Sequence, residues 1–197
     1  MSAHVAAAAA QWINVPQRHR VNLLGSEVTV DLMPVRDEWL RRQQLGLTGV
    51  PDRSLLRVLF GLPSDLPVAR ESLTASQVRV LRRAPAGVCV LHRPTVTRLL
   101  VPALRVQQVA LESAPNRGAL RDLSQFAPFA PQLLISTREP VDDNLLREAE
   151  FLGIGVQARS GRLLLEPTWR RPSRHTSAAW LFVEAVTRQV LGEPVLF

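Results

Sequence analysis

The pattern that most constrains this chain is the alternation of short apolar runs with amphipathic segments after Gly87. Short runs rich in Val, Leu and Ile are typical of buried strands, and apolar residues spaced three and four apart are typical of helices. Strands are predicted at 88–91, 95–101, 106–112, 132–136, 154–158 and 163–165, and helices at 119–127, 142–152 and 176–191. Three strands before the first helix, followed by strand–helix–strand, predict an α/β fold with a mixed central sheet flanked by helices.

The residues before Gly87 predict a small β-hairpin followed by a helical region. Apolar runs at 21–24 and 28–32 flank Gly25-Ser26-Glu27, a pattern typical of a hairpin. Helices are predicted at 37–45, 52–60 and 74–83, and the third begins with a capping box of Thr74 and Gln77. We therefore divide the chain into a flexible leader (1–20), a hairpin plus helical region (21–87) and an α/β domain that ends in a helix (88–197).

The basic residues are all arginine, and they outnumber the acidic residues. The chain has 24 basic residues, 17 acidic residues and a formal net charge of +7. Without lysine, the chemistry of a Schiff-base lysine or of a phosphate-loop lysine is excluded. Codon bias accounts for arginine in place of lysine, but it does not explain the excess of positive charge. That excess predicts a polyanionic partner, which is DNA, RNA or an anionic membrane surface.

Other classes of function lack the residues that they need. Cys89 is the only cysteine and lies in an apolar run, so we expect a structural thiol and no disulfide or cysteine-based metal site. The four histidines are widely separated and do not have metal-ligand spacing. No apolar run reaches transmembrane length, and the first ten residues lack the features of a signal peptide. We expect a cytoplasmic protein with no cofactor, no bound metal and no membrane partner.

Four consecutive segments occur in an order known from one group of nucleases. The strand that ends in Val109-Ala110-Leu111-Glu112 is followed by the helical segment 118–130, by the strand 132–136 and by 145–156, which includes Gly153-Ile154-Gly155. In this order the segment 88–166 resembles the restriction-endonuclease-like, or PD-(D/E)xK, superfamily. The resemblance implies a nuclease-like α/β domain, with Glu112 at the position of the motif's acidic residue.

The departures from the family pattern imply a degenerate site. The lysine of the motif would fall at Ala114, and the preceding strand, 98–102, has apolar residues where the family has its metal-binding Asp. A single carboxylate cannot hold Mg²⁺ and activate water. The resemblance therefore implies a scaffold that is inactive and binds DNA or protein. Catalytic activity would require relocated ligands, for instance Glu112 together with Asp122.

Two clusters of arginine are the candidate nucleic-acid-binding regions. Seven arginines and one acidic residue lie between Arg70 and Arg105, and five arginines and one acidic residue lie between Arg159 and Arg174. Such clusters can neutralise phosphates and release counterions. For any single arginine, a solvated charged surface is the alternative. The candidate residues are Gln77, Arg79, Arg82, Arg83, Arg93, Arg98, Arg170, Arg171 and Arg174, the last three beside Trp169, which could stack on a base.

The first cluster also fits the element order of a winged helix. Three helices are followed by the hairpin 88–101, so that 74–83 would be the recognition helix and the hairpin, with Arg93 and Arg98, would be the wing. The alternative is an ordinary three-helix packing unit.

Four functions remain open at this point. The first is a non-enzymatic DNA-binding protein on a nuclease-like scaffold, in repair or genome maintenance, with its C-terminal helix as core or as the seam of a homodimer. The second is a winged-helix transcription regulator, the third an active metal-dependent nuclease and the fourth a protein-interaction adaptor. The regulator would bind specific sequences, whereas the first function predicts binding to many sequences with a steep salt dependence.

Overall fold

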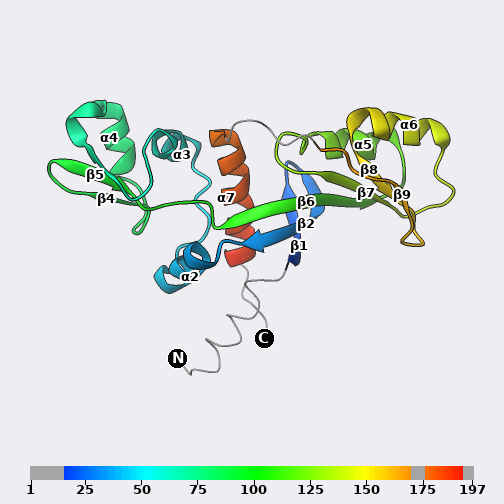
Figure 1. Ribbon diagram of the computed structural model, residues 1–197, viewed down its shortest axis with the longest axis horizontal. Coiled ribbons are helices and arrows are strands. Elements are labelled where there is room, and N and C mark those ends of the chain that lie inside the picture. The colour runs from blue at the N-terminus through cyan, green and yellow to red at the C-terminus, as the bar shows by residue number, and fades with distance from the viewer. Residues whose placement is uncertain (1–15, 170–175, 193–197) are drawn as a thin grey trace, which may run out of the picture. The chain divides into compact units, whose positions relative to one another are not determined.

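The computed structural model describes residues 16–169 and 176–192 and divides the chain into two compact units (Figure 1). The first unit contains the described parts of 1–33 and 105–174, and the second contains those of 34–104 and 175–197. The second unit is thus formed by a long internal segment together with the C-terminal helix. This division differs from the boundaries drawn from the sequence, which placed the hairpin with the helical region and the last helix with the α/β domain.

The first unit is built on a six-stranded sheet with the strand order β1-β2-β6-β7-β8-β9. Strands β1 and β2 are antiparallel, β6, β7 and β8 are parallel, and β9 is antiparallel to β8. Helices α5 and α6 share an apolar core with β7 and β8, which places both helices on the same face of the sheet. The predicted α/β fold with a mixed central sheet flanked by helices is confirmed. The elements are β1 (Gln17–Leu23), β2 (Ser26–Pro34), β6 (Leu104–Ser113), α5 (Arg117–Ser124), β7 (Gln132–Ser136), α6 (Asp143–Leu152), β8 (Gly155–Gln157) and β9 (Leu163–Leu165).

The β1–β2 hairpin is longer than the sequence pattern predicts. Its turn consists of Leu24 and Gly25, whose φ angles of 53° and 84° match the twist of two-residue hairpin turns. Strand β1 begins at Gln17, inside the segment that we assigned to a leader, because Arg18 forms a two-pronged ion pair with Asp31 on β2, with contacts of 2.7 and 3.0 Å. Residues 1–15 of the predicted leader lie outside the described residues.

The Gly153-Ile154-Gly155 motif has a packing role. Gly153 ends α6 in the left-handed conformation, with φ 72°, as the sequence predicts. A Cβ atom on Gly155 would lie 2.7 Å from Cδ and 2.8 Å from N of Pro167, since the segment after β9 runs directly over this glycine. Glycine is therefore required at position 155, because the backbone of β8 and the segment that contains Pro167 approach each other closely there.

Substituting Gly155 with alanine is expected to destabilise the first unit by about 1–3 kcal/mol, because the added methyl overpacks a backbone contact that cannot relax by side-chain rotation. Urea denaturation followed by circular dichroism measures the effect. An unchanged midpoint would show that the Pro167 segment moves aside freely.

The second unit combines helices with a small antiparallel sheet of order β3-β5-β4. Leucines of α3 and α4, Val88 and Val96 of the hairpin region, and Trp180 of α7 share one apolar core. Asp52 caps α3 as predicted, and Thr74 and Gln77 form the predicted capping box at the start of α4. The elements are α2 (Arg36–Leu45), α3 (Arg53–Phe60), β3 (Pro67–Ala69), the 3₁₀ turn η1 (Arg70–Ser72), α4 (Ala75–Leu81), β4 (Cys89–Leu91), β5 (Thr95–Arg98) and α7 (Ser177–Gly192).

The assignment of the strands 88–91 and 95–101 to the central sheet is wrong. These strands form β4 and β5 of the small sheet, and the central sheet receives its additional strands from the N-terminal hairpin. The physical reason is burial: Val88 and Val96 are fully buried against the helices of the second unit. The order of strands in a sheet depends on contacts between segments far apart in sequence. The local alternation of apolar and polar residues does not indicate these contacts.

Helix α7 is part of the core of the second unit. Trp180 and Val190 are buried, and the helix packs against α3. Trp180 and Val190 are therefore used within the chain, whereas Leu181 and Val183 of the same helix are half-buried, and the homodimer stays a prediction. Among the described residues, no helix has both the length and the apolar character that crossing a membrane requires.

A buried ion network joins α2 to α7. The guanidinium of Arg42 donates to both carboxylate oxygens of Glu184 at 2.7 Å, to Glu38 at 2.8 Å and to the carbonyl of Val101 at 2.6 Å. Arg42 and Glu184 are both completely buried. Burial alone would lower the pKa of Arg42, but the hydrogen bonds and charges of Glu184 and Glu38 outweigh it, so the pKa is raised.

Candidate nucleic-acid interface

Helix α4 presents a row of arginines on its outer side. Val78 and Leu81 of α4 are buried in the core, so the opposite side of the helix faces solvent. Arg79, Arg82 and Arg83 are spaced three and four residues apart, which puts them on one helical face, and all three are exposed. The backbone N–H of Arg82 still donates to Val78, so the helical path continues past the end of α4. The three guanidinium groups therefore extend from one side of a short helix.

The β4–β5 hairpin contributes a fourth exposed arginine at its tip. Strands β4 and β5 are paired in the register Leu91↔Val96, and the turn between them contains Arg93. The backbone N–H of Arg70 donates to the carbonyl of Pro94 at 2.8 Å, which ties the segment before α4 to this turn. The sequence did not predict β3, because three residues between Pro67 and a 3₁₀ turn are too few to show alternation. We call Arg79, Arg82, Arg83 and Arg93 the α4–hairpin surface, after helix α4 and the β4–β5 hairpin, which Figure 1 labels.

The segment that forms the α4–hairpin surface carries a positive charge. The sequence contains no Asp or Glu between Glu71 and Glu112. Among the described residues, no ion pair and no side-chain hydrogen bond involves the guanidinium groups of these four arginines. Residues 34–104 and 175–197 contain 12 arginines and seven acidic residues, so this unit has a formal charge of +5. Most of the net charge of the protein therefore belongs to the unit that presents this surface.

Gln77 does not present its amide oxygen for base recognition. That oxygen accepts hydrogen bonds from the backbone N–H of Thr74 at 2.8 Å and from the Thr74 hydroxyl at 3.1 Å. The capping box thus uses the amide oxygen of Gln77, and the contact of this residue with nucleic acid stays a prediction.

Arg98 is half-buried at the end of β5, and its guanidinium group contacts other parts of the unit. Its guanidinium donates to the carbonyl of Leu59 at 2.9 Å and to the hydroxyl of Ser64, and its Cζ lies 5.3 Å from the centroid of the Trp180 ring. Burial lowers the pKa of Arg98, and the charge of Asp65 opposes this effect. Arg98 therefore attaches strand β5 to α3 and α7, and its contact with nucleic acid stays a prediction.

The second arginine cluster is only partly described. Arg170, Arg171 and Arg174 lie outside the described residues. Arg159 and Arg162 are exposed near the β8–β9 turn. The indole N–H of Trp169 donates to the carbonyl of Ala127 at 2.9 Å, so one edge of this ring is held against the first unit.

Glu112 and Asp122 are not brought together. Leu111 packs against the core under α5 and α6, so its neighbour Glu112 points from β6 to the opposite face of the sheet. Asp122 lies on α5, and this helix covers the face of the sheet toward which Leu111 points. Residues 16–169 and 176–192 contain no group of three His, Cys, Asp or Glu side chains that could hold a metal ion. The pair that an active nuclease would use is therefore separated by the sheet.

Cys89 is half-buried on β4, and its thiol is directed at the carbonyl of Leu81, 3.8 Å away. Burial raises the pKa of this thiol, which disfavours the reactive thiolate.

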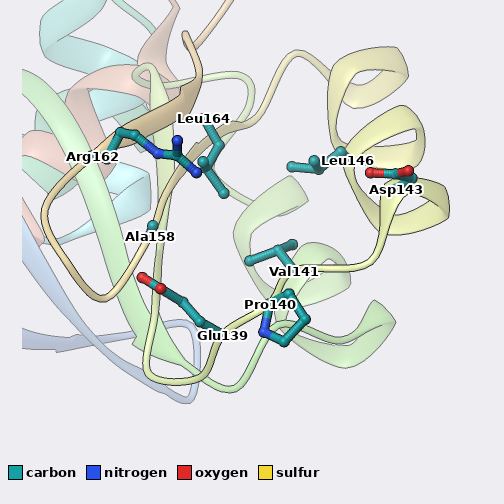
Figure 2. Close-up of a pocket in the computed structure, with 8 residues that line it drawn as sticks. All are labelled: Glu139, Pro140, Val141, Asp143, Leu146, Ala158, Arg162 and Leu164. Carbon is teal, nitrogen blue, oxygen red and sulfur yellow. The ribbon is translucent and has the colours of Figure 1, made fainter.

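A cavity of about 510 Å³ lies in the first unit between the β7–α6 loop, the start of α6 and the β8–β9 turn (Figure 2). Its lining combines apolar groups with the charges of Glu139, Asp143 and Arg162. The pKa of Glu139 is lowered, because its carboxylate accepts a hydrogen bond of 3.0 Å from the backbone N–H of Ser160. The lining contains no histidine, cysteine or hydroxyl nucleophile, and its charges are mixed in sign. This composition does not select a ligand class, so the α4–hairpin surface is the stronger candidate site.

No family model, curated protein or solved structure matches this chain.

Proposed function

We propose that this protein binds DNA without acting on it chemically, and that the α4–hairpin surface is the part that contacts the DNA. The observation that carries the proposal is the exposure of four arginines without acidic partners on one helix and one hairpin tip of a small unit. A guanidinium group donates two parallel hydrogen bonds to a phosphate, which makes arginine well suited to a nucleic-acid backbone.

Two features of the fold support the proposal. Helix α3, strand β3, helix α4 and the β4–β5 hairpin follow one another in an order that fits a winged helix, with the sheet order β3-β5-β4. In the first unit, β6, α5, β7, α6 and β8 have the order that resembles the nuclease superfamily, and Ala114 stands where its motif has lysine. A scaffold of that type fits a role in DNA binding.

Replacing Arg79, Arg82 and Arg83 with glutamine is expected to weaken DNA binding by roughly 100-fold at 0.1 M salt, because each lost phosphate contact removes the release of about one counterion. The slope of log K against log salt should become less negative by up to about 3. Fluorescence anisotropy of labelled DNA, titrated with the whole chain at several salt concentrations, measures both quantities.

The matched control replaces Arg105, Arg121 and Arg147 of the first unit with glutamine. These arginines are also exposed, and the change in net charge is the same. If both triple variants lose the same affinity, the overall charge attracts the DNA and the α4–hairpin surface is not the site. If the unmodified protein does not bind DNA at low salt, the proposed function is wrong and a protein-interaction adaptor takes its place.

A further inference from the structure

We infer that the α4–hairpin surface binds double-stranded DNA and discriminates little between sequences. The inference rests on the proposed function and specifies its substrate class. Two properties of the surface support it. The surface presents few polar side chains that could contact bases, and it lacks the aromatic side chains on which bases stack.

Helix α4 offers few groups that could distinguish one base pair from another. It contains seven residues, and its core-facing side is apolar. The hydroxyl of Ser76 is hydrogen-bonded to that of Thr74 at 2.9 Å, and the amide oxygen of Gln77 belongs to the capping box. Arg79 is therefore the only charged side chain within the exposed helical face of α4, and the amide nitrogen of Gln77 is the other long polar group without a hydrogen bond there. Arg82 and Arg83 follow the end of the helix, where phosphate contacts are the simplest role for a guanidinium group.

The magnitude of this limited base recognition can be estimated. One good bidentate contact from an arginine to a guanine contributes about 1–3 kcal/mol of discrimination, a factor of roughly 5–150. Sequence-specific proteins prefer their sites by about 4–10 kcal/mol over other DNA. A single base-contacting arginine cannot reach that range, so phosphate contacts dominate the binding free energy.

The same surface lacks the aromatic groups that single-stranded DNA requires. Proteins that bind single strands stack successive bases on aromatic side chains, each contributing about 1–3 kcal/mol. The sequence contains no Phe, Tyr or Trp between Phe60 and Phe126, and the single imidazole of His92 at the hairpin tip cannot form a stacking platform. Guanidinium groups without neighbouring rings can contact phosphates but cannot stack on bases, which favours a duplex over a single strand.

The test is a selection of the whole protein against a pool of random DNA duplexes, followed by anisotropy titrations of the selected sequences. We expect no enriched motif longer than one base pair, and affinities for unrelated duplexes of equal length that agree within about 150-fold. The corresponding single strands should bind at least about tenfold more weakly, since they offer no stacking gain. Arg79→Gln should weaken binding to every duplex by the same factor.

Two results would overturn the inference while leaving the proposed function intact. One is an enriched motif that binds more than about 1000-fold tighter than random duplex, which is the range of sequence-specific proteins. The other is tighter binding to single strands than to duplexes. If neither form of DNA binds at low salt, the proposed function fails together with the inference.

Discussion

The variant Gly49→Ala is expected to lose about 3 kcal/mol or more of stability, enough to unfold a large fraction of a marginally stable unit. A Cβ atom at this position would collide with the carbonyl oxygen of Glu184 and with N of Arg188, and would lie 2.8 Å from Cα of Arg188. All three atoms belong to the backbone of α7, which cannot rotate away as a side chain can. The loop before α3 would have to separate from α7.

That separation would have consequences beyond the collision itself. The backbone N–H of Val50 donates to Glu184 at 2.9 Å, and this hydrogen bond would be lost in the buried interior. Chemical denaturation followed by circular dichroism measures the loss of stability. The control is Gly61→Ala, at φ −78° with its nearest new contact at an ordinary 3.5 Å, which should leave stability unchanged or raise it by up to about 1 kcal/mol. If the two variants unfold at the same denaturant concentration, α7 does not lie as close to Gly49 as the structure shows.

The second large effect is expected at Arg42, where substitution with methionine should cost about 3–5 kcal/mol. The change leaves the carboxylate of Glu184 buried without its counter-charge. That carboxylate would keep only the backbone N–H of Val50 and the indole N–H of Trp180 as donors. Glu38 would still have Arg41, which donates to it at 2.7 and 2.8 Å. The large cost therefore arises from one uncompensated charge in a dry interior.

The comparison variant for Arg42→Met is Arg117→Met. It removes an ion pair with Glu148 whose arginine side chain is 81% exposed, and an exposed pair is expected to contribute less than about 1 kcal/mol. Thermal unfolding of both variants measures the contrast. Similar losses of stability in the two variants would mean that the ion network of Arg42 is open to water, contrary to its burial in the structure.

These two positions were not visible in the sequence for the same physical reason. Gly49 is close to α7 in space but more than a hundred residues away along the chain. The sequence separation between Arg42 and Glu184, which form an ion pair, is also more than a hundred residues. A single glutamate in an apolar helix, such as Glu184, and a glycine in a loop, such as Gly49, can each have several local roles. Only the tertiary contacts show which role each residue has.

The sequence by itself determined the local elements of this protein. The capping box of Thr74, the cap of Asp52 and the left-handed Gly153 are as expected, because each depends on bonds between residues a few positions apart. The buried strand 132–136 also has its predicted bounds, since a short apolar run between turns has few alternatives.

Tertiary structure decided which strands share a sheet and which arginines remain free. Strand β6 pairs with β2 and not with the adjacent hairpin, because burial of Val88 and Val96 holds that hairpin on the helical core. The same hairpin carries Arg93 into solvent and Arg98 over Trp180, although both lie in one basic stretch of sequence. An arginine's charge is fixed by its chemistry, but whether that charge is available to a partner depends on the long-range packing around it.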